Sequence, residues 1–82
     1  MDLDQTDKAI LAYLMDHRSA TLDQLEAALG VPVGELWHRL FALKVRGCVA
    51  QFERGWEATV GGVRALDPTP EQVIRWVWGP RS

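Results

Sequence analysis

Apolar residues recur at spacings of three and four positions in three successive stretches of this chain. Such spacing places one apolar stripe along a helix, and it predicts helices over residues 4–17, 21–29 and 32–46. The residues expected to lie along these stripes and face the core are Ile10, Leu11, Tyr13, Leu14, His17, Leu22, Leu25, Ala28, Leu29, Leu36, Leu40 and Leu43.

The second and third predicted helices carry boundary signals. Thr21 and Gln24 form the capping-box pattern, in which a hydroxyl and an amide side chain satisfy the first free backbone N–H groups. Gly30 is a helix terminator. Pro32 fits the first position of the next helix, where no N–H donor is needed. The two helices are therefore expected to be joined by a very short turn.

After Gly47 the pattern changes from helical to extended. Residues 48–52 and 56–60 contain types that favour a pleated, half-buried surface. The polar segment 53–55 contains a glycine and is typical of a hairpin turn. The connector at residues 18–20 is a candidate third strand for this hairpin.

The rest of the chain is predicted to contain a linker and one more helix. Gly61 and Gly62 indicate a flexible, extended linker over residues 61–68. Pro70, preceded by a threonine, is a helix-start signal. We therefore expect a C-terminal helix over residues 69–78, after a core and hairpin over residues 4–60.

The bulk properties fit one small domain that spans residues 1–82. The chain is 48% hydrophobic and 24% charged, as in ordinary globular proteins. No apolar run approaches the length of about 18 residues that a membrane span needs, and the polar, acidic N-terminus differs from a secretory signal. One cysteine cannot form an internal disulfide, so a reducing, cytoplasmic compartment is expected.

Several motifs together resemble a known superfamily. They are TLDQLEAALGV at 21–31, LWHRLFAL at 36–43, RGCV at 46–49 and the glycine-bearing hairpin. This pattern resembles the winged helix-turn-helix superfamily of bacterial regulators. The local likeness is greatest to the C-terminal winged-helix domain of the DNA-processing protein DprA, whose Pro-Val-x-Glu run and core positions are matched by Pro32, Val33, Glu35, Leu40, Leu43, Gly47 and Val49.

The resemblance covers about 50 of the 82 residues. It implies an α+β winged helix-turn-helix fold, with a three-helix core, a short two-stranded wing and, in this chain, an added C-terminal helix. The nucleotide-fold domain that precedes the module in that family is absent from this sequence. Domains that bind left-handed nucleic acid share the frame but carry Asn and Tyr where this chain has Trp37 and Phe41, so their activity is not carried over.

In a helix-turn-helix the second helix of the motif enters the major groove. The corresponding residues of this chain, with one arginine of the hairpin turn, are the candidate DNA contacts: Val33, Gly34, Trp37, His38, Arg39, Phe41 and Arg54. Residues 1–30 carry six acids and two bases, whereas residues 31–82 carry five acids and seven bases. The basic excess in the half of the chain that carries the candidate contacts permits DNA binding, and scattered surface charge that keeps the chain soluble explains it equally well. The helix-turn-helix pattern leads us to expect sequence-specific double-stranded DNA binding by a small transcriptional regulator.

The same residues allow other interpretations. Val33, Trp37 and Phe41 are spaced by four and form an apolar face typical of a protein–protein interface, unless the hairpin or the last helix covers Trp37. The C-terminal helix is rich in apolar residues that could pack on the first helix, form a homodimer or contact a partner: Val73, Ile74, Trp76, Val77 and Trp78.

Catalytic patterns are missing from the sequence. His17 and His38 fall on different predicted helices, and Cys48 is expected to be a small buried apolar residue. Gly61 and Gly62 lack the Lys-Ser/Thr and helix start of a phosphate loop. We therefore expect no enzyme activity, no cofactor and no metal site.

Overall fold

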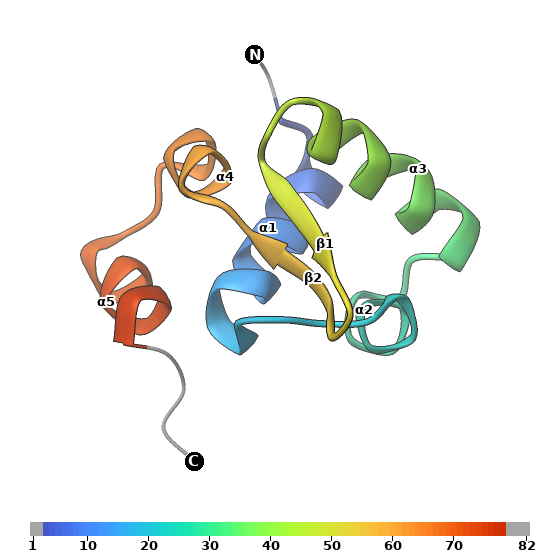
Figure 1. Cartoon of the computed structure of the whole chain (residues 1–82), viewed down its shortest axis with the longest axis horizontal. Helices are drawn as coiled ribbons and strands as arrows, with labels where there is room; N and C mark the ends of the chain where they lie inside the picture. Colours follow the sequence, from blue (N-terminus) through green and yellow to red (C-terminus); the bar gives the residue numbers. More distant parts are fainter. Residues whose placement is uncertain (1–2, 79–82) are drawn as a thin grey trace.

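The structure is a computed structural model that describes residues 3–78 of the chain. These residues form five helices and one two-stranded antiparallel sheet, an α+β arrangement compatible with a winged-helix-like layout (Figure 1). In chain order the elements are α1 (Gln5–His17), α2 (Leu22–Leu29), α3 (Val33–Val45), β1 (Val49–Phe52), β2 (Gly55–Ala58), α4 (Val60–Leu66) and α5 (Pro70–Trp78).

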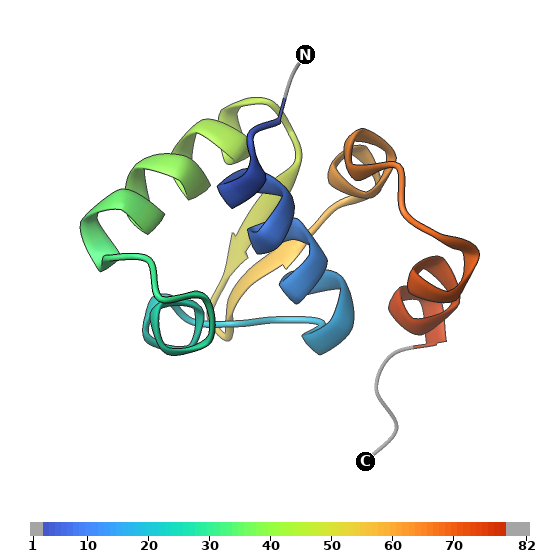
Figure 2. The same ribbon diagram turned by 180° about the vertical axis from the view of Figure 1, so that it is seen from behind.

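The helix α1 is the centre of the molecule. Figure 2 shows α2 and α3 on one side of it, α4 and α5 on the other, and the hairpin behind. The core lies between these elements, and its most completely buried side chains are Ile10, Leu11, Leu14, Met15, Leu25, Leu36, Leu40, Leu43 and Cys48. Burial of this apolar surface is the main force that holds the helices together.

The predicted helix boundaries are largely confirmed. Asp4 caps α1 by accepting from the Asp7 N–H at 2.8 Å, and Thr21 begins α2 with the predicted capping box. Gly30 ends α2 in the left-handed region, with φ at 69°. Pro32 is the N-cap of α3, one position earlier than predicted, because its ψ of 145° is extended.

Two residues predicted to face the core are exposed. Ala28 lies on the outer side of α2, because this helix of 8 residues turns mainly Leu25 inward. His17 is exposed at the end of α1, where its ring stacks on Tyr13 with the centroids 3.9 Å apart. Tyr13 itself is half-buried.

The hairpin is tighter than predicted, and the connector after α1 pairs with it at one residue. Phe52 pairs with Gly55, so the turn contains residues 53–54 only, and Gly55 adopts a φ of 130° that favours glycine. Ala20 exchanges two backbone hydrogen bonds with Trp56, at 3.0 and 2.7 Å. The connector after α1 therefore meets β2 through one isolated bridge, and it forms no third strand.

The prediction of a flexible, extended linker is wrong, because residues 60–66 form α4. Thr59 caps this helix: its hydroxyl accepts from the Gly62 N–H at 3.1 Å and donates to the Gly47 carbonyl. A Cβ on Gly62 would overlap the Cys48 carbonyl oxygen and lie 3.0 Å from a Leu11 methyl. The glycine thus permits close packing of α4 on the junction between α3 and β1.

The C-terminal helix is confirmed over Pro70–Trp78. Its start is at the predicted threonine and has a reciprocal cap: the Thr69 N–H donates to the Gln72 side chain at 2.9 Å, and the Gln72 N–H donates to the Thr69 hydroxyl at 3.3 Å. The helix packs against α1, and Arg75 forms an ion pair with Asp16 at 3.1 Å. This packing places α5 at the opposite side of α1 from α3 (Figure 2).

Candidate functional site

The outer face of α3 is exposed along the whole helix. Leu36, Leu40 and Leu43 are at most 1% exposed and hold the inner face against the core. The turn between α2 and α3 consists of residues 30–32 only, so it leaves the outer face open. The exposed positions on the helix include Gly34, Trp37, His38, Phe41, Ala42 and Val45, whereas Val33 is half-buried.

Three of these side chains form a continuous apolar stripe. We call these three residues, Trp37, Phe41 and Val45, the α3 stripe. They are 44%, 53% and 75% exposed, respectively. Their spacing of four places them one turn apart along one side of the helix. Val45 was not among the predicted site residues, although its position four residues after Phe41 is a signal that the sequence contains.

The hairpin contacts Trp37 without covering it. The ring of Trp37 meets the buried ring of Trp56 edge-on, with the centroids 5.9 Å apart and the planes at 75°. Its other neighbour is Phe41, at 6.3 Å. The alternative that the hairpin or α5 covers Trp37 is therefore wrong, because 44% of the residue is exposed and α5 lies beyond α1.

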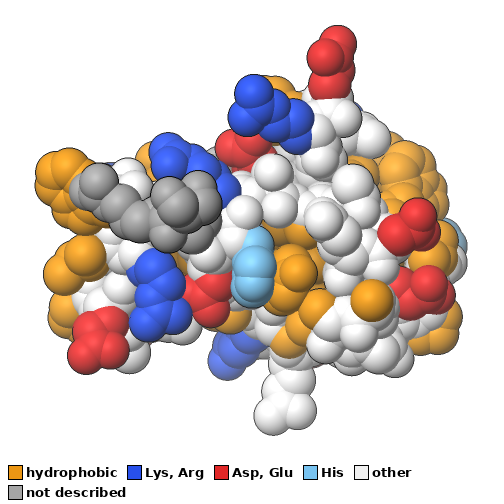
Figure 3. All heavy atoms as spheres, turned by 90° about the horizontal axis from the view of Figure 1, so that it is seen from below, with side chains coloured by type: hydrophobic (Ala, Val, Ile, Leu, Met, Phe, Trp, Pro, Cys, Tyr) orange, Lys and Arg blue, Asp and Glu red, His pale blue; other side chains and the backbone are white. Residues whose placement is uncertain are grey.

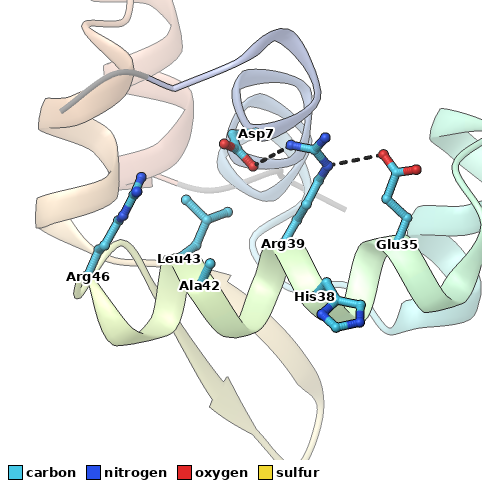
Figure 4. Close-up of a pocket in the computed structure, with 7 residues that line it drawn as sticks. All are labelled: Asp7, Glu35, His38, Arg39, Ala42, Leu43 and Arg46. Atoms are coloured by element: carbon cyan, nitrogen blue, oxygen red, sulfur yellow. Dashed lines mark hydrogen bonds and ion pairs between the residues drawn. The ribbon is translucent and has the colours of Figure 1, made fainter.

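The structure separates Arg39 from the other candidate DNA contacts. Position 39 is about 200° around the helix from position 37, so Arg39 projects toward the start of α1 (Figure 4). There its guanidinium pairs with Asp4, with Asp7 at 3.4 Å and with Glu35 at 3.1 Å. Hydrogen bonds to Asp4 and Glu35 raise the pKa of Arg39. The predicted grouping of Arg39 with Trp37 and Phe41 is thus corrected, since its charge is already matched by carboxylates.

The same contacts act on the carboxylate at the start of α1. The Asp7 backbone N–H and the Arg39 guanidinium lower the pKa of Asp4 below its ordinary value of 3.8. This charged cluster borders a shallow pocket of about 310 Å³ that is also lined by His38 and Arg46. Because two arginines and two carboxylates, Asp7 and Glu35, line this pocket, its lining has no net positive charge that would favour an anion.

Other cations are available near the open face. Lys44 and Arg46 are exposed at the C-terminal end of α3, and Arg54 is exposed in the hairpin turn. None of the three has a carboxylate within 4.0 Å among residues 3–78. Arg46 lies on the side of α3 that carries Arg39, about 180° around the helix from Trp37 (Figure 4). The structure thus places two unpaired positive charges, Lys44 and Arg54, near the α3 stripe, and only Arg54 was predicted as a contact.

The candidate contacts on α5 fall into two groups. Val73 and Trp76 are half-buried, and Trp76 packs against the core. Ile74, Val77 and Trp78 are 58%, 54% and 67% exposed. Packing on α1 therefore accounts for part of the predicted apolar surface and leaves the remainder open.

Comparison with known proteins identifies no relative of this chain. No protein-family model, curated protein sequence or solved structure matches the chain. The resemblance to winged-helix proteins therefore stays a prediction. Within residues 3–78, no helix is long and apolar enough to cross a membrane, and no three His, Cys, Asp or Glu side chains are grouped so that they could hold a metal ion.

Proposed function

We propose that this chain is a winged-helix domain that binds double-stranded DNA in transcriptional control, with the outer face of α3 in the major groove. The observation that carries the proposal is the open face of α3, which follows a turn of residues 30–32 and lies beside a hairpin. A helix presented in this way can enter the groove, while the hairpin reaches the flanking backbone.

The exposed side chains have distinct roles in this proposal. Lys44 and Arg54 contact phosphates, which supply affinity but no sequence information. His38 donates to or accepts from a base edge, and Phe41 contacts a thymine methyl group. Arg39 holds α3 against α1 and contacts no phosphate, because its carboxylate partners already satisfy it.

The glycine at the start of α3 supports close approach of a ligand. A Cβ built on Gly34 would meet no described atom within 4 Å, so packing does not require a glycine there. Glycine also costs helix stability, about 1 kcal/mol relative to alanine. Its missing side chain leaves room for a groove wall to approach the first turn of the helix.

The first test is fluorescence anisotropy with a labelled random-sequence duplex, titrated at low and physiological salt. Two phosphate contacts per chain predict that log K falls with log salt with a slope of about −2. Lys44→Glu and Arg54→Glu should each weaken binding and reduce this slope by about 1 or more. Arg64→Glu is the matched control, since Arg64 is exposed on α4, away from the proposed contacts.

Absence of binding by the wild-type chain at low salt would reject the proposal. If Arg64→Glu and Arg54→Glu lose DNA affinity equally, the assigned binding face is rejected, because affinity would then depend on the total charge of the protein alone. If binding is found, selection from a random library then tests for a preferred site, and His38→Ala should relax that preference.

A second function is favoured by the α3 stripe. Exposed aromatic residues commonly anchor protein–protein interfaces, and Trp37 and Phe41 are 44% and 53% exposed. In that case Trp37→Ala and Phe41→Ala should abolish capture of a protein partner. Arg54→Glu should then have little effect, which is the opposite of its effect on DNA binding.

A further inference from the structure

Another pocket lies between the end of α1, the strand β2 and the helix α5. Its volume is about 300 Å³, and it is lined by Arg18, Glu57, Ala58, Trp76 and Val77. Pockets for small molecules range upward from about this size. Figure 3 shows basic and acidic side chains beside the hydrophobic side chains over α5, at the left edge of the molecule. Because α5 and α3 lie on opposite sides of α1 (Figure 2), a ligand in this pocket would leave the outer face of α3 open.

The pocket contains one positive and one negative side chain that do not neutralise each other. Arg18 directly follows the last residue of α1, and Glu57 lies in β2. Neither has an ion-pair partner within 4.0 Å among residues 3–78. Arg39, by contrast, is surrounded by carboxylates. Two opposite charges that line one pocket without meeting leave room for a ligand that carries both charges and contacts each side chain.

The backbone of Arg18 has an unusual, strained conformation. Its φ is 67° and its ψ is −52°, and the Ser19 N–H donates to the His17 carbonyl at 2.7 Å across it. This is a γ-turn of the rare type, which is strained for any residue except glycine. The turn itself therefore does not require an arginine. Strained residues are concentrated at ligand sites, and here the strained residue carries the positive charge of the pocket.

The rest of the lining is apolar. Trp76 is half-buried and packs against the core, and Ala58 is 9% exposed, so both are held in place by the fold. Val77 is exposed at the rim. The face of a tryptophan ring contacts alkyl groups favourably and also attracts an ammonium ion. The pocket therefore combines a donor for a carboxylate, an acceptor for an ammonium group and an apolar wall.

We propose that this pocket binds a small apolar α-amino acid. The Arg18 guanidinium donates two hydrogen bonds to the carboxylate of the ligand, a pairing that its planar shape favours. The Glu57 carboxylate accepts from the ammonium group, and the side chain of the ligand lies against Trp76 and Val77. A ligand of about nine heavy atoms, such as leucine, gains limited binding energy, so we expect a dissociation constant on the order of 1 mM.

NMR of the isotope-labelled chain without DNA tests this site independently of the proposed function. Titration with L-leucine to about 30 mM, well above the expected dissociation constant, should saturate the site. The backbone signals of Arg18 and Glu57 and the indole signal of Trp76 should shift, whereas those of the α3 stripe should not. Isocaproate lacks the ammonium group of leucine, and isoamylamine lacks its carboxylate. Each should bind at least tenfold more weakly than leucine, because one charged contact is lost.

Variants of the two charged residues test their roles. Glu57→Gln should raise the dissociation constant for leucine at least tenfold. Glu53→Gln is the matched control, since Glu53 is exposed in the hairpin turn and does not line the pocket. Arg18→Gly should also weaken binding at least tenfold but without a fall in Tm, because glycine adopts positive φ readily. This combination separates loss of the ligand contact from loss of folding.

Several results would overturn the amino-acid site. They are the absence of saturable shifts with L-leucine, equal affinity for leucine and isocaproate or isoamylamine, and full leucine binding by Arg18→Gly. Equal leucine affinity of Glu57→Gln and Glu53→Gln would overturn it as well. None of these results bears on DNA binding by α3, which the anisotropy titration measures separately.

Discussion

Replacement of Gly62 by alanine should destabilise the protein strongly, although alanine is the better helix former. Gly62 lies in α4 and is buried. A Cβ at this position would overlap the Cys48 carbonyl oxygen and lie 2.9 Å from the carbonyl carbon. Such an overlap is costly because the obstacle is backbone, which cannot rotate away as a side chain can.

The Cys48 backbone is also fixed by its own hydrogen bonds. Its N–H donates to the Leu43 carbonyl at 2.8 Å, and its carbonyl accepts from the Thr59 N–H at 3.0 Å. The helix α4 would therefore have to move outward and reduce the packing of Val63, which is 7% exposed. Overpacking of this kind costs about 1–3 kcal/mol, and loss of the Thr59 bond adds about 1 kcal/mol.

Alanine recovers about 1 kcal/mol of helix propensity, so the expected net loss for Gly62→Ala is about 2 kcal/mol. For a domain of this size, that corresponds to a fall in Tm of about 8–16 °C. Gly34→Ala is the matched control, because Gly34 also lies inside a helix but has open space around its Cα. The free energy of unfolding of Gly34→Ala should rise by up to about 1 kcal/mol.

Urea unfolding, followed by tryptophan fluorescence and far-UV circular dichroism, measures both changes. Trp56 is 2% exposed and therefore reports on the core. All variants should be compared at one protein concentration, since association shifts apparent stability. If Gly62→Ala is as stable as the wild type, α4 does not pack against Cys48 as described, and the steric argument fails.

Three further predictions concern the caps and the charged cluster. Thr59→Ala should lose about 1–2 kcal/mol, whereas Thr59→Ser should retain most of the stability; equal losses in urea unfolding would contradict the cap. Because the pKa of Asp4 is lowered in the folded protein, its stabilisation is present above pH of about 4 and is lost as pH falls through the lowered value. In Asp4→Asn, the free energy of unfolding should therefore fall less between pH 5 and pH 2 than it does in the wild type. An unchanged pH dependence would exclude this role for Asp4. Arg39→Gln should lower Tm but leave the salt slope of DNA binding unchanged, and a slope reduced by about 1 would show that Arg39 contacts a phosphate after all.

The sequence by itself determined the features that depend on neighbours within about four residues. The stripe of Leu36, Leu40 and Leu43 identified both the helix α3 and its buried side. The capping pairs at Thr21 and Thr69 marked the starts of α2 and α5 correctly. These signals are reliable because helix periodicity and end-capping act between residues that are close in the chain.

Gly61 and Gly62 show where local reasoning failed. Two adjacent glycines indicate a break when only the chain neighbours are considered. The hydroxyl of Thr59 and the close approach of Cys48 instead favour a helix there. The threonine three residues before Gly62 is a cap signal that the sequence contains, whereas the space available to a Cβ depends on how α4 packs.

Only the tertiary structure decided which candidate residues are free to bind. Arg39 and Asp4 are 35 positions apart in the chain, and their pairing follows from the packing of α1 on α3. The exposure of Trp37 depends on how far Trp56 of the hairpin reaches across it. Likewise, the packing of α5 on α1 buries Trp76 partly and leaves Trp78 open. Periodicity places a residue on a side of its helix, but the availability of its side chain depends on residues that are distant in sequence and close in space.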